Sequence, residues 1–219
     1  MPGSYKKIQK SYKIISPLRA KYPNLVLDCN SVFTASSEIY LLDALKTINK
    51  DFGFDNMSVT YARGVIKDDS LKNVSKNRYK EINKFLEERE KNKEKRLLYP
   101  LWRGINSVSR ENLMRTVFDD EFVTSCVAGR KLLVVSETGE VQPCEILGKS
   151  IGNLRNHDWD LNKLLKENSV NKMQKWIKET KCKCSFECAL AANVVWKPKN
   201  YPKVISSAIK NIGKSHLNH

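Results

Sequence analysis

Five of the six cysteines in the chain fall between residues 126 and 188. Cys126 and Cys144 flank an apolar segment that contains a glycine, and Cys182, Cys184 and Cys188 lie close together in KCKCSFEC. The N-terminus is basic and lacks the apolar core of a secretion signal, so we expect a cytoplasmic, reducing location. Thiols grouped in this way in such a compartment are more often metal ligands than disulfide partners.

The spacing of the last three cysteines predicts that their sulfur atoms converge. Cys182 and Cys184 are two residues apart, and side chains two apart in an extended chain point the same way. If a helix begins near Cys184, then Cys184 and Cys188 share one helical face. Three thiols can therefore meet within one short segment.

A predicted β-hairpin connects the first two cysteines. Residues 131–135 indicate an apolar strand, residues 136–139 a turn that contains Gly139, and residues 140–146 a return strand. Such a hairpin would bring Cys126 and Cys144 to the same end.

The cysteine spacing favours an iron–sulfur cluster over a single ion. A [4Fe–4S] cube takes one thiolate at each iron, whereas structural zinc takes four cysteines that usually come from paired C-x2-C motifs. The chain has no C-x2-C, and the C-x-C-x3-C grouping fits the wider cube better. Zinc and buried free thiols remain alternatives. Cys29 lies alone in a predicted strand, where a cysteine is usually a small buried apolar residue.

The net charge of +15 on 219 residues raises the question of an anionic partner. Only ten of the 39 basic residues are arginine, and the lysines are spread along the whole chain. Sites that recognise nucleic acid tend to cluster arginine, so the charge is better explained as a general surface property. No apolar run approaches the ~20 residues that span a bilayer.

Residues 1–96 predict an alternating α/β pattern. An amphipathic segment over 4–22 precedes a strand within 24–36 that is apolar on both faces, a helix over 38–53, a strand over 57–64 and a polar helix over 74–96. This order implies a parallel sheet with right-handed crossovers. Two parallel strands leave open edges, so this part is expected to belong to a larger sheet or barrel, completed by another part or another chain.

The rest of the chain divides into three segments. Residues 97–122 are expected to form a bridge in which Pro100 ends the preceding helix and a short helix begins near Ser109. Residues 123–196 form the cysteine module, with a helix over 169–180, and residues 197–219 form a basic tail.

At these cysteines the chain resembles the SPASM/twitch extension at the C-terminus of radical S-adenosylmethionine (SAM) enzymes. The residues that carry the resemblance are Cys126-x12-Gly139-x4-Cys144, then GNL at 152–154 and Cys184-x3-Cys188. They match the family pattern C-x9–15-G-x4-C followed by further cysteines with a C-x3-C pair. The resemblance is specific over about 120–196. Residues 1–96 more loosely resemble later βα units of the partial barrel of these enzymes.

The resemblance implies a partial (βα) barrel segment at 1–96 and a small α+β, twitch-like domain at 123–196. Cys126, Cys144, Cys184 and Cys188 would bind one auxiliary [4Fe–4S] cluster for electron relay or substrate anchoring, and Cys182 could replace Cys184. The C-x3-C-x2-C loop that binds the radical-generating cluster is absent from these residues. Catalysis with S-adenosylmethionine would therefore need an N-terminal half or a partner chain that supplies it.

Two further residues lie near predicted strand ends, where barrel sites are found. Asn30 and Arg63 could touch the cofactor or substrate, although capping by Asn30 and a surface ion pair of Arg63 are the simpler interpretations. The sequence assigns no catalytic residue and no substrate. The alternative function is a zinc-stabilised basic module that binds nucleic acid or a protein partner.

Overall fold

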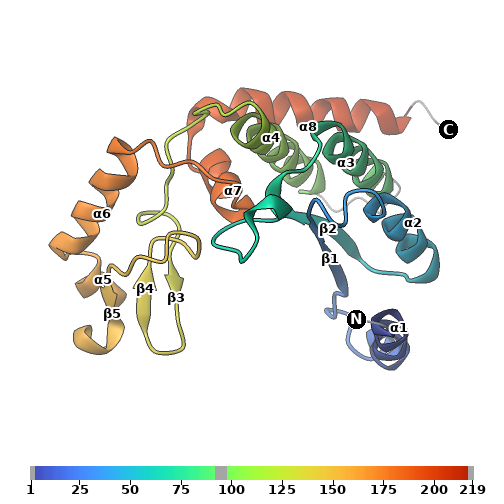
Figure 1. Cartoon of the computed structure of the whole chain (residues 1–219), viewed down its shortest axis with the longest axis horizontal. Helices are drawn as coiled ribbons and strands as arrows, with labels where there is room; N and C mark the ends of the chain where they lie inside the picture. The colour runs from blue at the N-terminus through green and yellow to red at the C-terminus, as the bar shows by residue number, and fades with distance from the viewer. Residues whose placement is uncertain (1–2, 92–97, 217–219) are drawn as a thin grey trace. The chain divides into compact units, whose positions relative to one another are not determined.

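The computed structural model describes residues 3–91 and 98–216 and divides the chain into two compact units (Figure 1). The first unit comprises Met1–Ala62 and Asp68–Glu90, and the second comprises Arg63–Lys67 and Lys91–His219. Helices accompany two small sheets, which confirms the general α/β class predicted from the sequence. Among the described residues the strands form no closed barrel.

The first unit is built on two parallel strands, β1 (Asp28–Phe33) and β2 (Asn56–Tyr61), joined by helix α2 (Leu41–Asp51). The strands pair without a bulge, from Asp28 opposite Asn56 to Phe33 opposite Tyr61. The remaining elements are α1 (Ser4–Ile15), a 3-10 helix (Ser16–Ala20), a second 3-10 helix (Asp69–Lys72) and α3 (Lys76–Lys91). The end of the predicted helix 74–96 lies outside the described residues.

Only one face of the β1–β2 sheet carries buried side chains. Phe33, Met57 and Tyr61 are buried on that face, and the ring of Phe33 lies 5.8 Å from the ring of Tyr79 in α3. On the other face Val32 is 53% exposed. The sequence places apolar residues on both faces of this strand, which predicts that both faces are covered; in the described residues burial instead alternates along β1, so one face is not covered.

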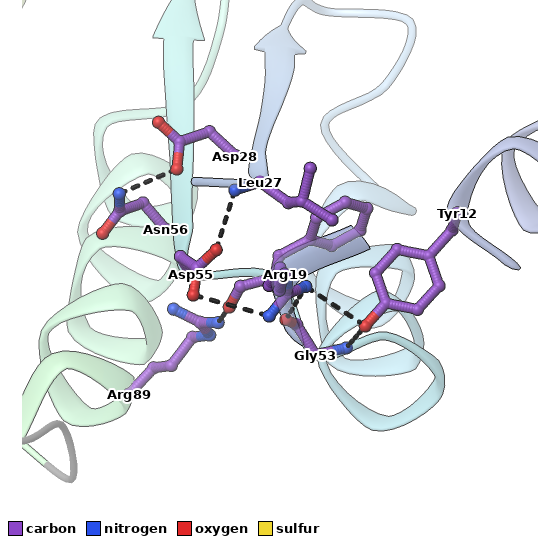
Figure 2. A network of polar contacts seen from close by, with 9 residues as sticks. Tyr12, Arg19, Leu27, Asp28, Gly53, Asp55, Asn56 and Arg89 are labelled. Atoms are coloured by element: carbon purple, nitrogen blue, oxygen red, sulfur yellow. Dashed lines mark hydrogen bonds and ion pairs between the residues drawn. The ribbon is translucent and has the colours of Figure 1, made fainter. Parts of the chain in front are cut away.

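A polar network fastens the N-terminal helices to the rest of the first unit (Figure 2). The hydroxyl of Tyr12 accepts a hydrogen bond from the backbone N–H of Gly53 at 2.8 Å, and Arg19 donates to the Gly53 carbonyl at 2.7 Å. Asp55 accepts from the backbone N–H of Leu27 at 2.7 Å and pairs with Arg19 at 3.5 Å. The network therefore fixes the chain on entry to both strands.

Three helices form one part of the second unit: α4 (Tyr99–Phe118), α7 (Glu187–Val195) and α8 (Tyr201–His216). They share a core of Val108, Val194 and Val204. The bridge is thus one 20-residue helix rather than a short one, because Pro100 occupies its first turn, where proline is tolerated. Helix α8 lies wholly within the predicted basic tail 197–219, and sequence reasoning missed this helix.

The other part of the second unit is a three-stranded antiparallel sheet of β3 (Val134–Val135), β4 (Glu140–Gln142) and β5 (Gly152–Asn153). The β3–β4 pair confirms the predicted hairpin, although its strands are shorter. A 3-10 helix (Leu154–His157), α5 (Leu161–Leu164) and α6 (Asn168–Glu179) follow, and a 3-10 helix (Pro198–Asn200) precedes α8. Val141, Ile151, Leu154, Leu164 and Val170 form the core beneath this sheet. None of the helices in the described part of the chain is long and apolar enough to cross a membrane.

Candidate functional site

Four of the five grouped cysteines meet at one apolar cluster in the second unit. Cys144 is buried within this cluster, and Cys126, Cys182 and Cys184 are half-buried against it. Cys188, in the first turn of α7, is exposed. We call the apolar cluster and the cysteines packed in it the thiol cluster. Its buried residues are Ala128, Cys144, Ile177, Phe186 and Ala189. Three separate segments of the chain therefore contribute cysteines to one apolar cluster.

The hairpin brings the first two cysteines to the thiol cluster. Gly139 takes a left-handed conformation with φ of 83°, and its N–H donates to the carbonyl of Ser136 at 3.0 Å, which closes the turn. Cys144 follows the end of β4 by two residues. On the other arm, the N–H of Ala128 donates to the sulfur of Cys126 at 3.5 Å.

A helix C-cap places Cys182. Helix α6 ends with Lys181 in the left-handed conformation, with φ of 48°. The N–H of Cys182 donates to the carbonyl of Ile177 at 3.1 Å, and the N–H of Lys181 donates to that of Lys178 at 3.3 Å. This pair of bonds is a Schellman motif, which reverses the chain immediately before the first of the three downstream cysteines.

Cys182 and Cys184 face the same cluster, as the period-two argument predicted. The intervening Lys183 instead pairs with Asp120 at 2.7 Å. Beyond Cys184, the N–H of Phe186 donates to its sulfur at 3.5 Å at the start of α7. Backbone N–H groups therefore donate to two of the sulfur atoms, those of Cys126 and Cys184.

Two residues that the sequence did not single out hold the segment around Cys126. Lys197 donates to the hydroxyl of Thr124 at 2.9 Å, and Asn193 of α7 accepts from the N–H of Val127 at 2.8 Å. Burial, with Lys199 adding to it, lowers the pKa of Lys197. Both are common polar residues more than sixty positions downstream, so no local sequence signal could have identified them.

The environment of Cys182 and Cys184 favours the protonated form of each thiol. Burial raises the pKa of Cys184 to about 11; the N–H of Phe186 opposes this shift, whereas Cys126, Cys182 and Cys144 add to it. Burial also raises the pKa of Cys182, with Cys126 and Cys144 adding to the shift. The mutual influence of these four groups follows from their proximity. Because metals bind the thiolate, a metal would have to displace these protons.

A small pocket lies beside the thiols. Cys126, Cys182 and Cys184 line it together with Thr116, Lys183 and Asn193, among others. No set of three or more histidine, cysteine, aspartate or glutamate side chains in residues 3–91 and 98–216 is arranged to hold a metal ion. In the described structure the thiols of this cluster are therefore not placed as the ligands of a metal ion.

The other predicted site residues lie in different surroundings. Asn30, on the exposed face of β1, accepts hydrogen bonds from Ser58 at 3.1 Å and Thr60 at 3.0 Å. Arg63 belongs to the second unit and pairs with Glu145 and Glu187. For Arg63, an ion pair was the simpler of the two interpretations, and the structure contains two such pairs. Asn30 does not cap a helix; its side chain accepts hydrogen bonds from the neighbouring strand β2.

Comparison of the chain with known protein families, curated proteins and solved structures finds no match. The resemblance to the SPASM/twitch extension therefore rests on the cysteine and glycine spacing of this sequence.

Proposed function

We propose that the second unit binds one [4Fe–4S] cluster at the thiol cluster and acts as the auxiliary domain of a radical SAM enzyme. The observation that carries the proposal is that Cys126, Cys144, Cys182 and Cys184, from three segments of the chain, all pack in one apolar cluster. Four thiols supply one ligand for each iron of such a cube. The bound group would supply one-electron transfer at this place.

The donor chemistry of the thiol cluster fits this group. The buried residues of the cluster are apolar, and the N–H groups of Ala128 and Phe186 already face the sulfur atoms of Cys126 and Cys184. Hydrogen bonds to sulfur and burial are the means by which a protein sets the potential of such a cluster. The proposed ligands differ from the sequence-based set in one respect: Cys182 takes the place of Cys188, which is exposed.

The first unit supports the part of the proposal that concerns a partner. Within residues 3–91 and 98–216 its sheet has two strands, so no further strand pairs with the outer edge of β1 or of β2, and one face carries no buried residue. Such an arrangement is marginal unless further strands extend it. We propose that the rest of a (βα) barrel, with the radical-generating cluster and the S-adenosylmethionine site, completes this sheet. Asn30 would then face the interior of that barrel.

The test is anaerobic reconstitution of the full chain with iron and sulfide. We expect a brown protein with about four irons and four sulfides per chain. Cys126→Ser, Cys144→Ser, Cys182→Ser and Cys184→Ser should each lose much of this iron. Cys188→Ser should retain it, and Cys29→Ser, which removes a half-buried thiol of the first unit, serves as the matched control.

The outcomes separate the candidate functions. A colourless protein that takes up no iron and holds one zinc per chain would contradict the proposal and favour the zinc-stabilised basic module. If Cys188→Ser loses iron and Cys182→Ser retains all of it, the protein still binds an iron–sulfur cluster, but Cys188 and not Cys182 is a ligand. The ligand set would then be the one that the family pattern implies.

A further inference from the structure

Arg63 makes three contacts that all lie beside cysteines of the thiol cluster. Its guanidinium pairs with the carboxylate of Glu145 at 3.0 Å and with that of Glu187, and it lies 4.8 Å from the centre of the Phe186 ring. The Arg63 side chain is only 21% exposed. Each contact is with a residue of the second unit, to which Arg63 itself belongs.

These partners come from the two cysteine-bearing segments. Glu145 directly follows Cys144, whereas Phe186 and Glu187 lie between Cys184 and Cys188. The segment after Arg63 also lies against the hairpin exit, since a Cβ on Gly64 would stand 3.8 Å from Ile146. One arginine therefore connects the end of the hairpin to the start of α7.

The charges explain why this connection matters. Glu145 and Glu187 share one guanidinium, so without it two carboxylates of like charge would stand close together and repel. The planar fork of arginine can bind both at once, which a lysine ammonium cannot do with the same geometry. Through Phe186 and Glu187, the arginine also holds the peptide whose N–H donates to the sulfur of Cys184.

We propose that Arg63 is a positioning residue that holds the Cys144 and Cys184 segments together, and that it orients the Phe186 N–H toward the Cys184 sulfur. The orienting role, which is tested in the reconstituted protein, rests on the proposed function. The holding of the two segments can be tested in the protein without metal.

The first experiment uses the metal-free full chain. Cys144 has 5% of its surface exposed, so its alkylation reports how often the two segments separate. Quantitative mass spectrometry should show that Arg63→Met increases the alkylation rate of Cys144 by about fivefold or more, because charge-assisted contacts are lost. Arg63→Lys should fall between Arg63→Met and the wild type.

Arg155→Met is the matched control. Arg155 likewise lies over an aromatic ring, 5.1 Å from the centre of Trp159, and donates to the Thr138 carbonyl at 2.9 Å. Neither Trp159 nor Thr138 is adjacent to a cysteine in the sequence. In Arg155→Met the alkylation rate of Cys144 should therefore stay within about twofold of the wild-type rate. Equal rates in the wild type, Arg63→Met and Arg155→Met would overturn the proposal. If Arg63→Met does not fold, the comparison is made between Arg63→Lys and the wild type. Equal alkylation rates of Cys144 in these two proteins would then overturn the proposal.

The second experiment measures the midpoint potential of the reconstituted protein. Arg63→Met removes a positive charge near the cluster and loosens the N–H···S bond, and both changes disfavour the reduced state. We expect a lower midpoint potential in Arg63→Met, an intermediate one in Arg63→Lys and no change in Arg155→Met. An unchanged potential in a fully loaded Arg63→Met protein would refute the orienting role. A wild-type chain that takes up no cluster would instead refute the proposed function, and the alkylation rates would still decide the holding role.

Discussion

Lys181 shows how a single residue directs the chain toward the thiol cluster. Its left-handed conformation costs a residue with a Cβ about 1 kcal/mol or more, a cost that glycine avoids. Lys181→Gly should therefore raise the free energy of unfolding by about 1 kcal/mol, measured by urea denaturation. Lys178→Gly, inside α6, is the control and should lower it by about the same amount. A Lys181→Gly protein no more stable than wild type would show that this conformation carries no strain.

At this scale the sequence identified which thiols to examine but not how they are held. The period-two spacing correctly placed Cys182 and Cys184 on one side, because that argument needs only local geometry. It could not foresee that Cys188 is exposed, since the position where α7 begins depends on packing in the second unit. Contacts such as those of Lys197 and Arg63 span many residues and have no local signature.

Among the helices, the approach of α4 to α8 depends on a residue with no side chain. A Cβ on Gly104 would stand 2.5 Å from the Val204 carbonyl oxygen, so the two helices would have to move apart. Gly104→Ala should lower the free energy of unfolding by about 1–3 kcal/mol despite the better helix propensity of alanine. Leu101→Ala, on the exposed surface of α4, should change it by less than about 1 kcal/mol in the same urea titration. A stabilised Gly104→Ala protein would contradict this close packing.

The errors of element prediction have physical causes. Pro100 was interpreted as a helix breaker, yet in the first turn of α4 its missing N–H has no helical partner to lose. The apolar content of the basic tail is modest, but Val204 is only 4% exposed and anchors α8 to Val108 and Val194. The hairpin was predicted correctly because turn residues and alternating strands are local signals.

At the scale of the whole chain, each unit has a core of its own, and this has a measurable consequence. The four tryptophans, at positions 102, 159, 176 and 196, all belong to the second unit, so tryptophan fluorescence reports on that unit alone. Circular dichroism at helical wavelengths reports on both units. We therefore expect urea unfolding of the metal-free chain to give one fluorescence transition and two transitions by circular dichroism.

An iron–sulfur cluster bound at the thiol cluster should stabilise the second unit against unfolding, because it binds the folded and not the unfolded form of that unit. The first unit, which does not bind it, should be unaffected. Reconstitution should therefore move the midpoint of the fluorescence transition to a higher urea concentration. The circular dichroism transition in which the first unit unfolds should keep its midpoint. Cys144→Ser, reconstituted in parallel, should show neither shift. A single transition that coincides for both probes, and that moves as a whole on reconstitution, would mean that the two units unfold as one cooperative body and that the thiol cluster stabilises the first unit as well.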